Sequence, residues 1–335
     1  MAAAIVVAVS RWQELVEASR LISRVRLPEM AVAVVCEALS ITCFAAVPWQ
    51  LLRAGGVWWR LRRVTAITVA ANAVAGALPG GAVFSAAWVF RQLCRRGVEQ
   101  VLAATVLVLA GALSAVSLFV LLVIGMFTVG STGSSAVVRP VVGVLALALG
   151  SGVVAFGLFR FTSFRSAVRG TWTRAGLRSE RVQKTQRALV RLVDQARDLQ
   201  PGFRPWLWPL SLALLNWVFD AACLAACLWA LGTGVPWQGL LLAYTLTQIS
   251  GSLRLTPGGL GVVEASLATL LVLYGLSPGA AIAATLLYRA VSYWALQPLG
   301  WACWFGVTFR TGTEGRTDGG THGHGGRNPP ERTGT

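Results

Sequence analysis

Residues 101–129 read VLAATVLVLAGALSAVSLFVLLVIGMFTV and contain no charged side chain. A helix needs about 20 such residues to cross the roughly 30 Å hydrocarbon layer of a bilayer. Comparable apolar runs cover residues 28–52, 140–161, 206–231 and 279–308. The sequence therefore predicts an all-α integral membrane protein that crosses the bilayer several times.

The composition excludes a soluble enzyme. Apolar residues make up 55% of the 335 residues and charged residues only 13%, whereas soluble domains carry about a quarter charged residues. The net charge of +16 is expected to orient the loops across the membrane rather than to bind nucleic acid. Both histidines, His322 and His324, lie in the Gly-rich C-terminal segment, so we expect no metal and no cofactor in the bilayer.

Two further apolar segments are interrupted by the same tripeptide. Pro79-Gly80-Gly81 breaks residues 64–90, and Pro257-Gly258-Gly259 breaks residues 240–274. Proline removes a backbone donor and glycine admits non-helical dihedral angles, so each segment is expected to form two half-helices or a sharp kink. With these segments, the sequence predicts about six to eight transmembrane helices.

The basic residues suggest an orientation. Residues 160–204 carry eleven basic and three acidic side chains, which places this loop in the cytoplasm by the positive-inside rule. The two broken segments would then enter the membrane from opposite sides as re-entrant hairpins, related by an inverted internal repeat. This topology puts the mixed-charge segment 11–26 outside, against the rule. The alternative is that residues 64–90 form a single kinked crossing.

These assignments divide the chain into two parts. Residues 1–309 form one polytopic transmembrane domain, and residues 310–335 form a Gly/Arg-rich tail that is expected to be disordered and cytoplasmic.

Ionisable side chains inside apolar spans are costly unless they face the protein interior or water. The sequence places five well inside the apolar segments, away from their ends: Glu37, Asp220, Arg254, Glu264 and Arg289. In the functional interpretation, Arg254 and Arg289 contact a lipid phosphate and Glu264 balances their charge or takes a proton. In the structural interpretation, Glu264 forms an ion pair with one of these arginines that only ties helices together. For Glu37 and Asp220, interhelical hydrogen bonding is the favoured interpretation.

The second break is the predicted anion site. A half-helix beginning at Gly258-Gly259 would leave free N–H groups and a positive dipole end where a ligand can approach the backbone closely. A phosphate of an anionic lipid head group suits such a site.

At this point the residues match a known pattern. The stretch Pro257-Gly258-Gly259-Leu260-Gly261-Val262-Val263-Glu264-Ala265, followed by Tyr288-Arg289-Ala290-Val291-Ser292-Tyr293-Trp294 and Pro298-Leu299-Gly300, resembles the lysylphosphatidylglycerol synthase transmembrane-region family. This family contains the flippase-like domain of the bacterial multiple peptide resistance factor and its stand-alone relatives. The resemblance implies a multi-pass plasma-membrane protein whose best-known relatives move aminoacylated phospholipid between leaflets.

The candidate residues follow from these motifs. The candidate lipid head-group site comprises Arg254, Pro257, Gly258, Gly259, Gly261, Glu264, Arg289 and Tyr293. The break in the first repeat comprises Pro79, Gly80 and Gly81.

Two departures from the family bear on function. Its first motif reads approximately P-G-R-x-G-E-x-x-R, and residues 79–87 keep only the Pro–Gly. The sequence also contains no soluble aminoacyl-transferase domain.

Three hypotheses follow. The first is a non-enzymatic lipid transporter or flippase for a phospholipid or an isoprenoid-phosphate lipid. The alternative is a non-transporting component that binds lipid or a partner envelope enzyme. An intramembrane lipid transferase is the weakest, because the spans hardly offer a base or a metal.

Overall fold

The computed structural model describes residues 12–77, 80–128, 204–252 and 256–314, and every regular element in these ranges is helical. The elements before the gap at 129–203 are α2 (Trp12–Ile22), α3 (Leu27–Ala54), α4 (Leu61–Ala77), α5 (Gly81–Arg95) and α6 (Gln100–Thr128). Those after it are α10 (Arg204–Ala230), α11 (Trp237–Ser252), a 3₁₀ turn (Pro257–Gly259), α12 (Val262–Leu273), α13 (Pro278–Arg289), a π-helical turn (Ala290–Trp294) and α14 (Leu296–Glu314).

Three of the described helices are long and apolar enough to cross a membrane: α3, α6 and Trp206–Ala230 of α10. They confirm the prediction of a helical membrane protein. The span predicted at 140–161 and the basic loop at 160–204 lie outside the described residues except for Arg204. Helix α14 continues to Glu314, beyond the boundary expected at 309, and the rest of the predicted tail is also outside the described part.

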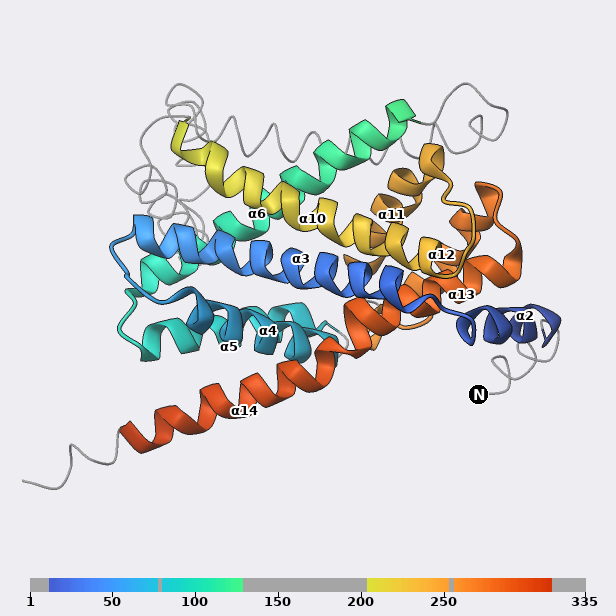
Figure 1. Ribbon diagram of the computed structural model, residues 1–335. Coiled ribbons are helices and arrows are strands. Elements are labelled where there is room, and N and C mark those ends of the chain that lie inside the picture. The colour runs from blue at the N-terminus through green and yellow to red at the C-terminus, as the bar shows by residue number, and fades with distance from the viewer. Residues whose placement is uncertain (1–11, 78–79, 129–203, 253–255, 315–335) are drawn as a thin grey trace, which may run out of the picture.

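Helices α3 and α10 pack side by side and antiparallel (Figure 1). The N–H of Arg26, just before α3, donates to the carbonyl of Ala230 at the end of α10 over 3.0 Å. At the other end, Trp206 of α10 belongs to the same buried cluster as Leu51 and Leu52 of α3. This pair forms the centre of the bundle, against which both broken segments pack.

The first broken segment folds back on itself. The hydroxyl of Ser85 in α5 donates to the carbonyl of Ala71 in α4 over 2.7 Å, so the two helices run past each other after the break. Gly80 adopts φ +67°, a left-handed conformation that favours glycine. Pro79 lies outside the described residues.

Gly81 lies where α5 starts against the end of α4. A Cβ at this position would collide with the backbone carbonyl of Ala75, which cannot move as a side chain does. We therefore expect Gly81→Leu to open the α4–α5 hairpin and to reduce the yield of folded protein. Size-exclusion profiles of the detergent-purified variant measure this directly; a wild-type yield would show that the two helices do not approach each other at this point.

The second broken segment contains two successive glycines in the left-handed region, Gly258 at φ +62° and Gly259 at φ +69°. They form the 3₁₀ turn between α11 and α12. The expectation that the second half-helix begins at Gly258-Gly259 is wrong, because α12 begins at Val262. The physical reason is a third left-handed glycine, Gly261 at φ +84°, which delays the start of the helix.

The last predicted span, 279–308, is helical but interrupted. A π-helical turn separates α13 from α14, and the N–H of Ala295 reaches back five residues to the carbonyl of Ala290 over 2.9 Å. Pro298 lies in the first turn of α14, where its missing N–H breaks no helical hydrogen bond. Such π turns are frequent at functional sites.

The interruptions of both broken segments lie close to this π turn, in the middle of the bundle (Figure 1). The hydroxyl of Tyr293 donates to the carbonyl of Gly76, near the end of α4, over 3.0 Å. The guanidinium of Arg289 donates to the carbonyl of Gly258 in the second break over 2.9 Å. The fold therefore brings the two interrupted backbones to one place.

Candidate functional site

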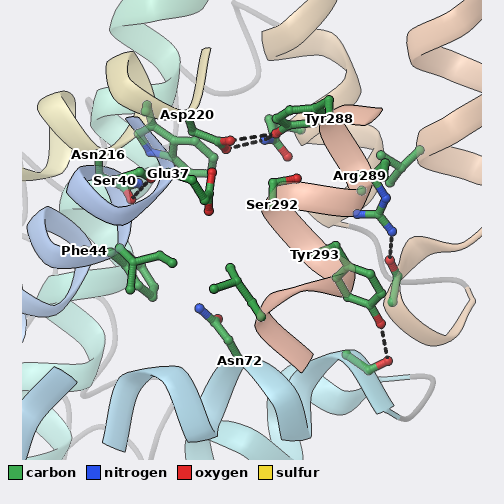
Figure 2. A pocket seen from close by; sticks show the side chains of 18 of the residues that line it. Glu37, Ser40, Phe44, Asn72, Asn216, Asp220, Tyr288, Arg289, Ser292 and Tyr293 are labelled. Carbon is green, nitrogen blue, oxygen red and sulfur yellow. Dashed lines mark hydrogen bonds between the residues drawn. The ribbon is translucent and has the colours of Figure 1, made fainter. Parts of the chain in front are cut away.

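A cavity of about 380 Å³ lies where these elements converge (Figure 2). Its wall includes polar side chains from α3, α4, α10, α13 and the π turn, and among them are Glu37, Asn72, Asn216, Asp220, Arg289 and Tyr293. Polar groups are rare inside apolar spans, and they mark substrate or ion pathways in membrane proteins. The cavity is therefore the candidate functional site.

Among the described residues that line this cavity, Arg289 carries the positive charge. Only 7% of its surface is exposed. Its Nε donates to Oε1 of Glu264 over 2.7 Å, and its Nη2 donates to the carbonyl of Gly258 over 2.9 Å. The guanidinium also stacks 4.3 Å from the ring centre of Tyr293. These contacts fix the guanidinium at the edge of the cavity.

A guanidinium has five N–H donors, and the hydrogen bonds found within the described residues use the Nε and Nη2 groups. The planar fork suits two-point binding of a phosphate or carboxylate. Arg289 is therefore positioned to bind an anion that enters the cavity.

Glu264 has both carboxylate oxygens engaged. Oε1 accepts from Arg289, while Oε2 accepts from the backbone N–H of Gly261 over 2.7 Å. This second bond caps the N-terminus of α12, so the expected free N–H group at that position is occupied by the protein's own carboxylate. Glu264 positions Arg289 and starts α12 at the same time, and the ion pair named in the structural interpretation is present.

Asp220 lies on the opposite wall and joins three helices. Its Oδ2 accepts from the hydroxyl of Tyr244 over 2.7 Å and from Nε2 of Gln248 over 2.9 Å. Its Oδ1 accepts from the hydroxyl of Tyr288 over 2.8 Å. The predicted interhelical hydrogen bonding of Asp220 is therefore present, and it connects α10 to α11 and α13.

The candidate residues from the sequence differ in where they lie. Gly258, Arg289 and Tyr293 line the cavity, and Glu264 reaches it through Arg289. Gly259 faces Val263 instead. Pro257 belongs to the 3₁₀ turn, and Gly261 is the N-cap of α12. Gly80 and Gly81 form the turn of the α4–α5 hairpin. Arg254 and Pro79 lie outside the described residues.

Sequence reasoning missed several polar residues of the cavity. Asn72, Asn216, Gln248, Tyr288 and Ser292 line it, although none of them was a candidate. The available signal was their polarity within otherwise apolar helices. Glu37 and Asp220 were identified by that signal, but only as structural groups.

A second cavity of about 410 Å³ adjoins the first and is mostly apolar. The two share Phe44, Asn72, Ser114 and Asn216 as wall residues. The second cavity extends between α3, α4, α5 and α6, with Leu52 among its lining residues. A polar compartment and an apolar one thus lie end to end inside the bundle.

The comparisons with known proteins agree with a membrane protein of this kind. The family described as "Lysylphosphatidylglycerol synthase TM region" matches residues 1–300. A "UPF0104 membrane protein" of Methanothermobacter thermautotrophicus is 30% identical over 89 residues, which are 27% of this chain and 27% of that protein. A second similar protein of the same name and organism is 26% identical over 94 residues, or 28% of each chain. The chain thus matches little more than a quarter of the length of these curated relatives.

Proposed function

The chain belongs to the lysylphosphatidylglycerol synthase transmembrane-region family, and from this premise we propose that it moves a phospholipid or an isoprenoid-phosphate lipid between the leaflets of the plasma membrane. The observation that carries the proposal is Arg289, a buried cation at the edge of a polar cavity where the breaks of both segments come together. Transport needs no covalent change of the lipid, and the proposal includes none.

The two adjoining cavities match the two parts of a lipid. The polar cavity with Arg289 suits the phosphate head group, whereas the apolar cavity suits a hydrocarbon tail. Membrane lipids, and among them those with anionic head groups, are accordingly the proposed ligands. This pairing favours an amphiphile over a water-soluble anion.

The contacts between helices support an inverted repeat that relates α3–α6 to α10–α13. The hairpin contact of α4 with α5 has its counterpart in α11 with α12, and the contact of α3 with α6 has its counterpart in α10 with α13. Such repeats place the substrate site near the bilayer midplane. In this arrangement the two Pro–Gly–Gly breaks are the tips of re-entrant hairpins that enter from opposite sides.

The charge of the loops supports one orientation. The loops α3–α4 and α5–α6 contain Arg60 and Arg96, and the guanidinium of Arg96 donates to the carbonyl of Val307 in the second half of α14 over 3.2 Å. The loops α10–α11 and α12–α13, at residues 231–236 and 274–277, contain no Lys or Arg. The opposite end carries Arg24 and Arg26 in the α2–α3 loop, and Arg26 is paired with Glu29 at 3.7 Å. By the positive-inside rule we place the end with Arg60 and Arg96, the loop at 160–204 and the C-terminus in the cytoplasm.

Cysteine labelling in intact cells tests this orientation. In a chain whose six native cysteines are replaced, an impermeant maleimide should modify Trp237→Cys, at the exposed start of α11, and not Arg62→Cys. Both should react after the cells are opened, which controls for accessibility. Labelling of Arg62→Cys alone in intact cells would reverse the proposed topology.

The function itself is tested in proteoliposomes. Fluorescent phosphatidylglycerol, aminoacylated phosphatidylglycerol, phosphatidylethanolamine and an isoprenoid phosphate are each placed in both leaflets, and an impermeant quencher then reports movement of the inner pool. We expect protein-dependent exchange of at least one phosphate-bearing lipid. Absence of exchange for all four lipids would contradict the proposal.

A second candidate function is a non-transporting component that binds lipid or a partner envelope enzyme. The observation that favours it is the first break, where residues 80–90 carry no charged side chain. In that case Arg289→Ala would change which proteins co-purify with the chain without any effect on lipid movement. Affinity purification of the wild type and the variant, alongside the exchange assay, separates the two functions.

A further inference from the structure

Glu37 of α3 is a buried acid that the head-group site does not use. The residue is 7% exposed and lines the polar cavity, and its Oε2 has no hydrogen-bond partner among the described residues. The carboxyl of Asp220 and the thiol of Cys223 are polar neighbours of this carboxyl. Figure 2 shows Glu37 and Asp220 next to each other on the wall opposite Arg289.

Two neighbouring carboxylates in a low-dielectric interior repel each other when both are ionised, so one of them holds a proton until a higher pH or a nearby cation favours its release. Among the described residues that line the cavity, the cation is Arg289, and it is already paired with Glu264 at 2.7 Å. Asp220 is the better site for the negative charge, because it accepts three hydrogen bonds, from Tyr244, Gln248 and Tyr288. Glu37 is then the site for the proton.

We propose that Glu37 and Asp220 hold one exchangeable proton in the transport cavity and that lipid movement is coupled to its binding and release. When the pair releases the proton, an O–H bond of the carboxyl breaks and the proton passes to water in the cavity. An O–H bond to that water forms in its place, and the charge of the pair changes from −1 to −2.

The groups that face this pair set how it responds to pH. On α3 the neighbour is Cys36, on α10 they are Cys223 and Cys227, on α11 it is Tyr244, and on α13 they are Tyr288 and Arg289. Arg289 keeps its charge at any ordinary pH, and the other groups are thiols and phenols, which ordinarily stay neutral near neutral pH. The carboxyl pair is therefore the group that exchanges a proton.

The coupling follows from the shared cavity, and it rests on the proposed function. A phosphate held by Arg289 and the carboxyl pair occupy the same small space, so the phosphate binds more favourably when the pair keeps its proton. By linkage, bound lipid must then favour the protonated pair to the same extent. Tyr288 and Arg289 are adjacent on α13, one bonded to Asp220 and the other to Gly258, which joins the two sites mechanically.

Difference infrared spectroscopy of the purified chain in lipid nanodiscs tests the proton site without any transport. The wild type should show a protonated-carboxyl C=O band that disappears as the buffer is made alkaline. Glu37→Gln, a near-isosteric change, and Asp220→Asn should each abolish this change, whereas Glu99→Gln, at an exposed acid before α6, should retain it. A band that does not respond to pH, or one that persists in both cavity variants, would overturn the proposal.

A pH gradient across proteoliposomes tests the coupling. With one proton per lipid, a gradient of about one pH unit can sustain up to about a tenfold ratio of anionic lipid between the leaflets. We expect such an asymmetry in the wild type and none in Glu37→Gln. If the wild type exchanged lipid but gave the same lipid ratio with and without the pH gradient, the coupling alone would be overturned. Absence of exchange for every lipid would overturn the proposed transport, while the infrared result still decides whether the proton site exists.

Discussion

Replacing Arg289 by glutamine should reduce lipid exchange at least about tenfold. A charge-assisted hydrogen bond contributes about 1.5–3 kcal/mol, so loss of one such bond to the phosphate accounts for a tenfold effect. The same change leaves Glu264 charged and unpaired, and breaking a buried ion pair costs about 3–5 kcal/mol of stability. The measurements are the exchange rate per folded molecule and the thermal unfolding temperature.

A double variant separates the two effects. Glu264→Gln with Arg289→Gln removes both charges and leaves no unpaired ion, so we expect most of the folded yield to return. Exchange should stay at background, because the described wall of the cavity then has no cation to bind the phosphate. If the double variant exchanged lipid at the wild-type rate, the pair would serve only to hold α12 against α13.

Gly258→Ala should have an effect of similar size. At φ +62° an alanine is strained by about 1–2 kcal/mol, and its Cβ would collide with the hydroxyl of Tyr293. Tyr293 must then give up its hydrogen bond to the carbonyl of Gly76. The loss of this bond moves the two breaks apart at the edge of the cavity. We expect exchange to fall at least about tenfold, measured in proteoliposomes at equal amounts of folded protein.

Gly232→Ala is the matched control. Gly232 also has a left-handed φ, +69°, but nothing lies within 4 Å of the position that a Cβ would take there. It shares the backbone strain and lacks the collision, so exchange per folded molecule should stay near the wild-type rate. Equal losses for Gly232→Ala and Gly258→Ala would show that strain alone, and not the contact with Tyr293, explains the result.

Much of the fold could be predicted because hydropathy and backbone chemistry are local. The uncharged run that contains α6 has one stable form in a bilayer. The positions of both breaks followed from Pro–Gly–Gly, which cannot continue a regular helix. The pairing of Arg289 with Glu264 in the protein interior was one of the alternatives that followed from the cost of an unpaired charge inside a span.

The rest depended on tertiary contacts. The π turn after Arg289 has no simple sequence signal, because Ala290 and Ala295 fit an α-helix equally well. The delayed start of α12 depends on the hydrogen bond from Gly261 to Glu264. No spacing in the sequence shows that Glu37 and Asp220 meet, since they lie on helices far apart in the chain and only the packing of α3 against α10 joins them.

The central claim is that the polar cavity holds the phosphate of a lipid, and photocrosslinking tests it most directly. A phospholipid with a photoreactive group beside its phosphate is reconstituted with the chain, irradiated, and mapped by mass spectrometry. We predict crosslinks to cavity residues such as Asn72 and Ser292, and their loss in the Glu264→Gln, Arg289→Gln double variant. Crosslinks confined to exposed side chains of α3 such as Val34 and Val35, and unchanged in the double variant, would contradict it.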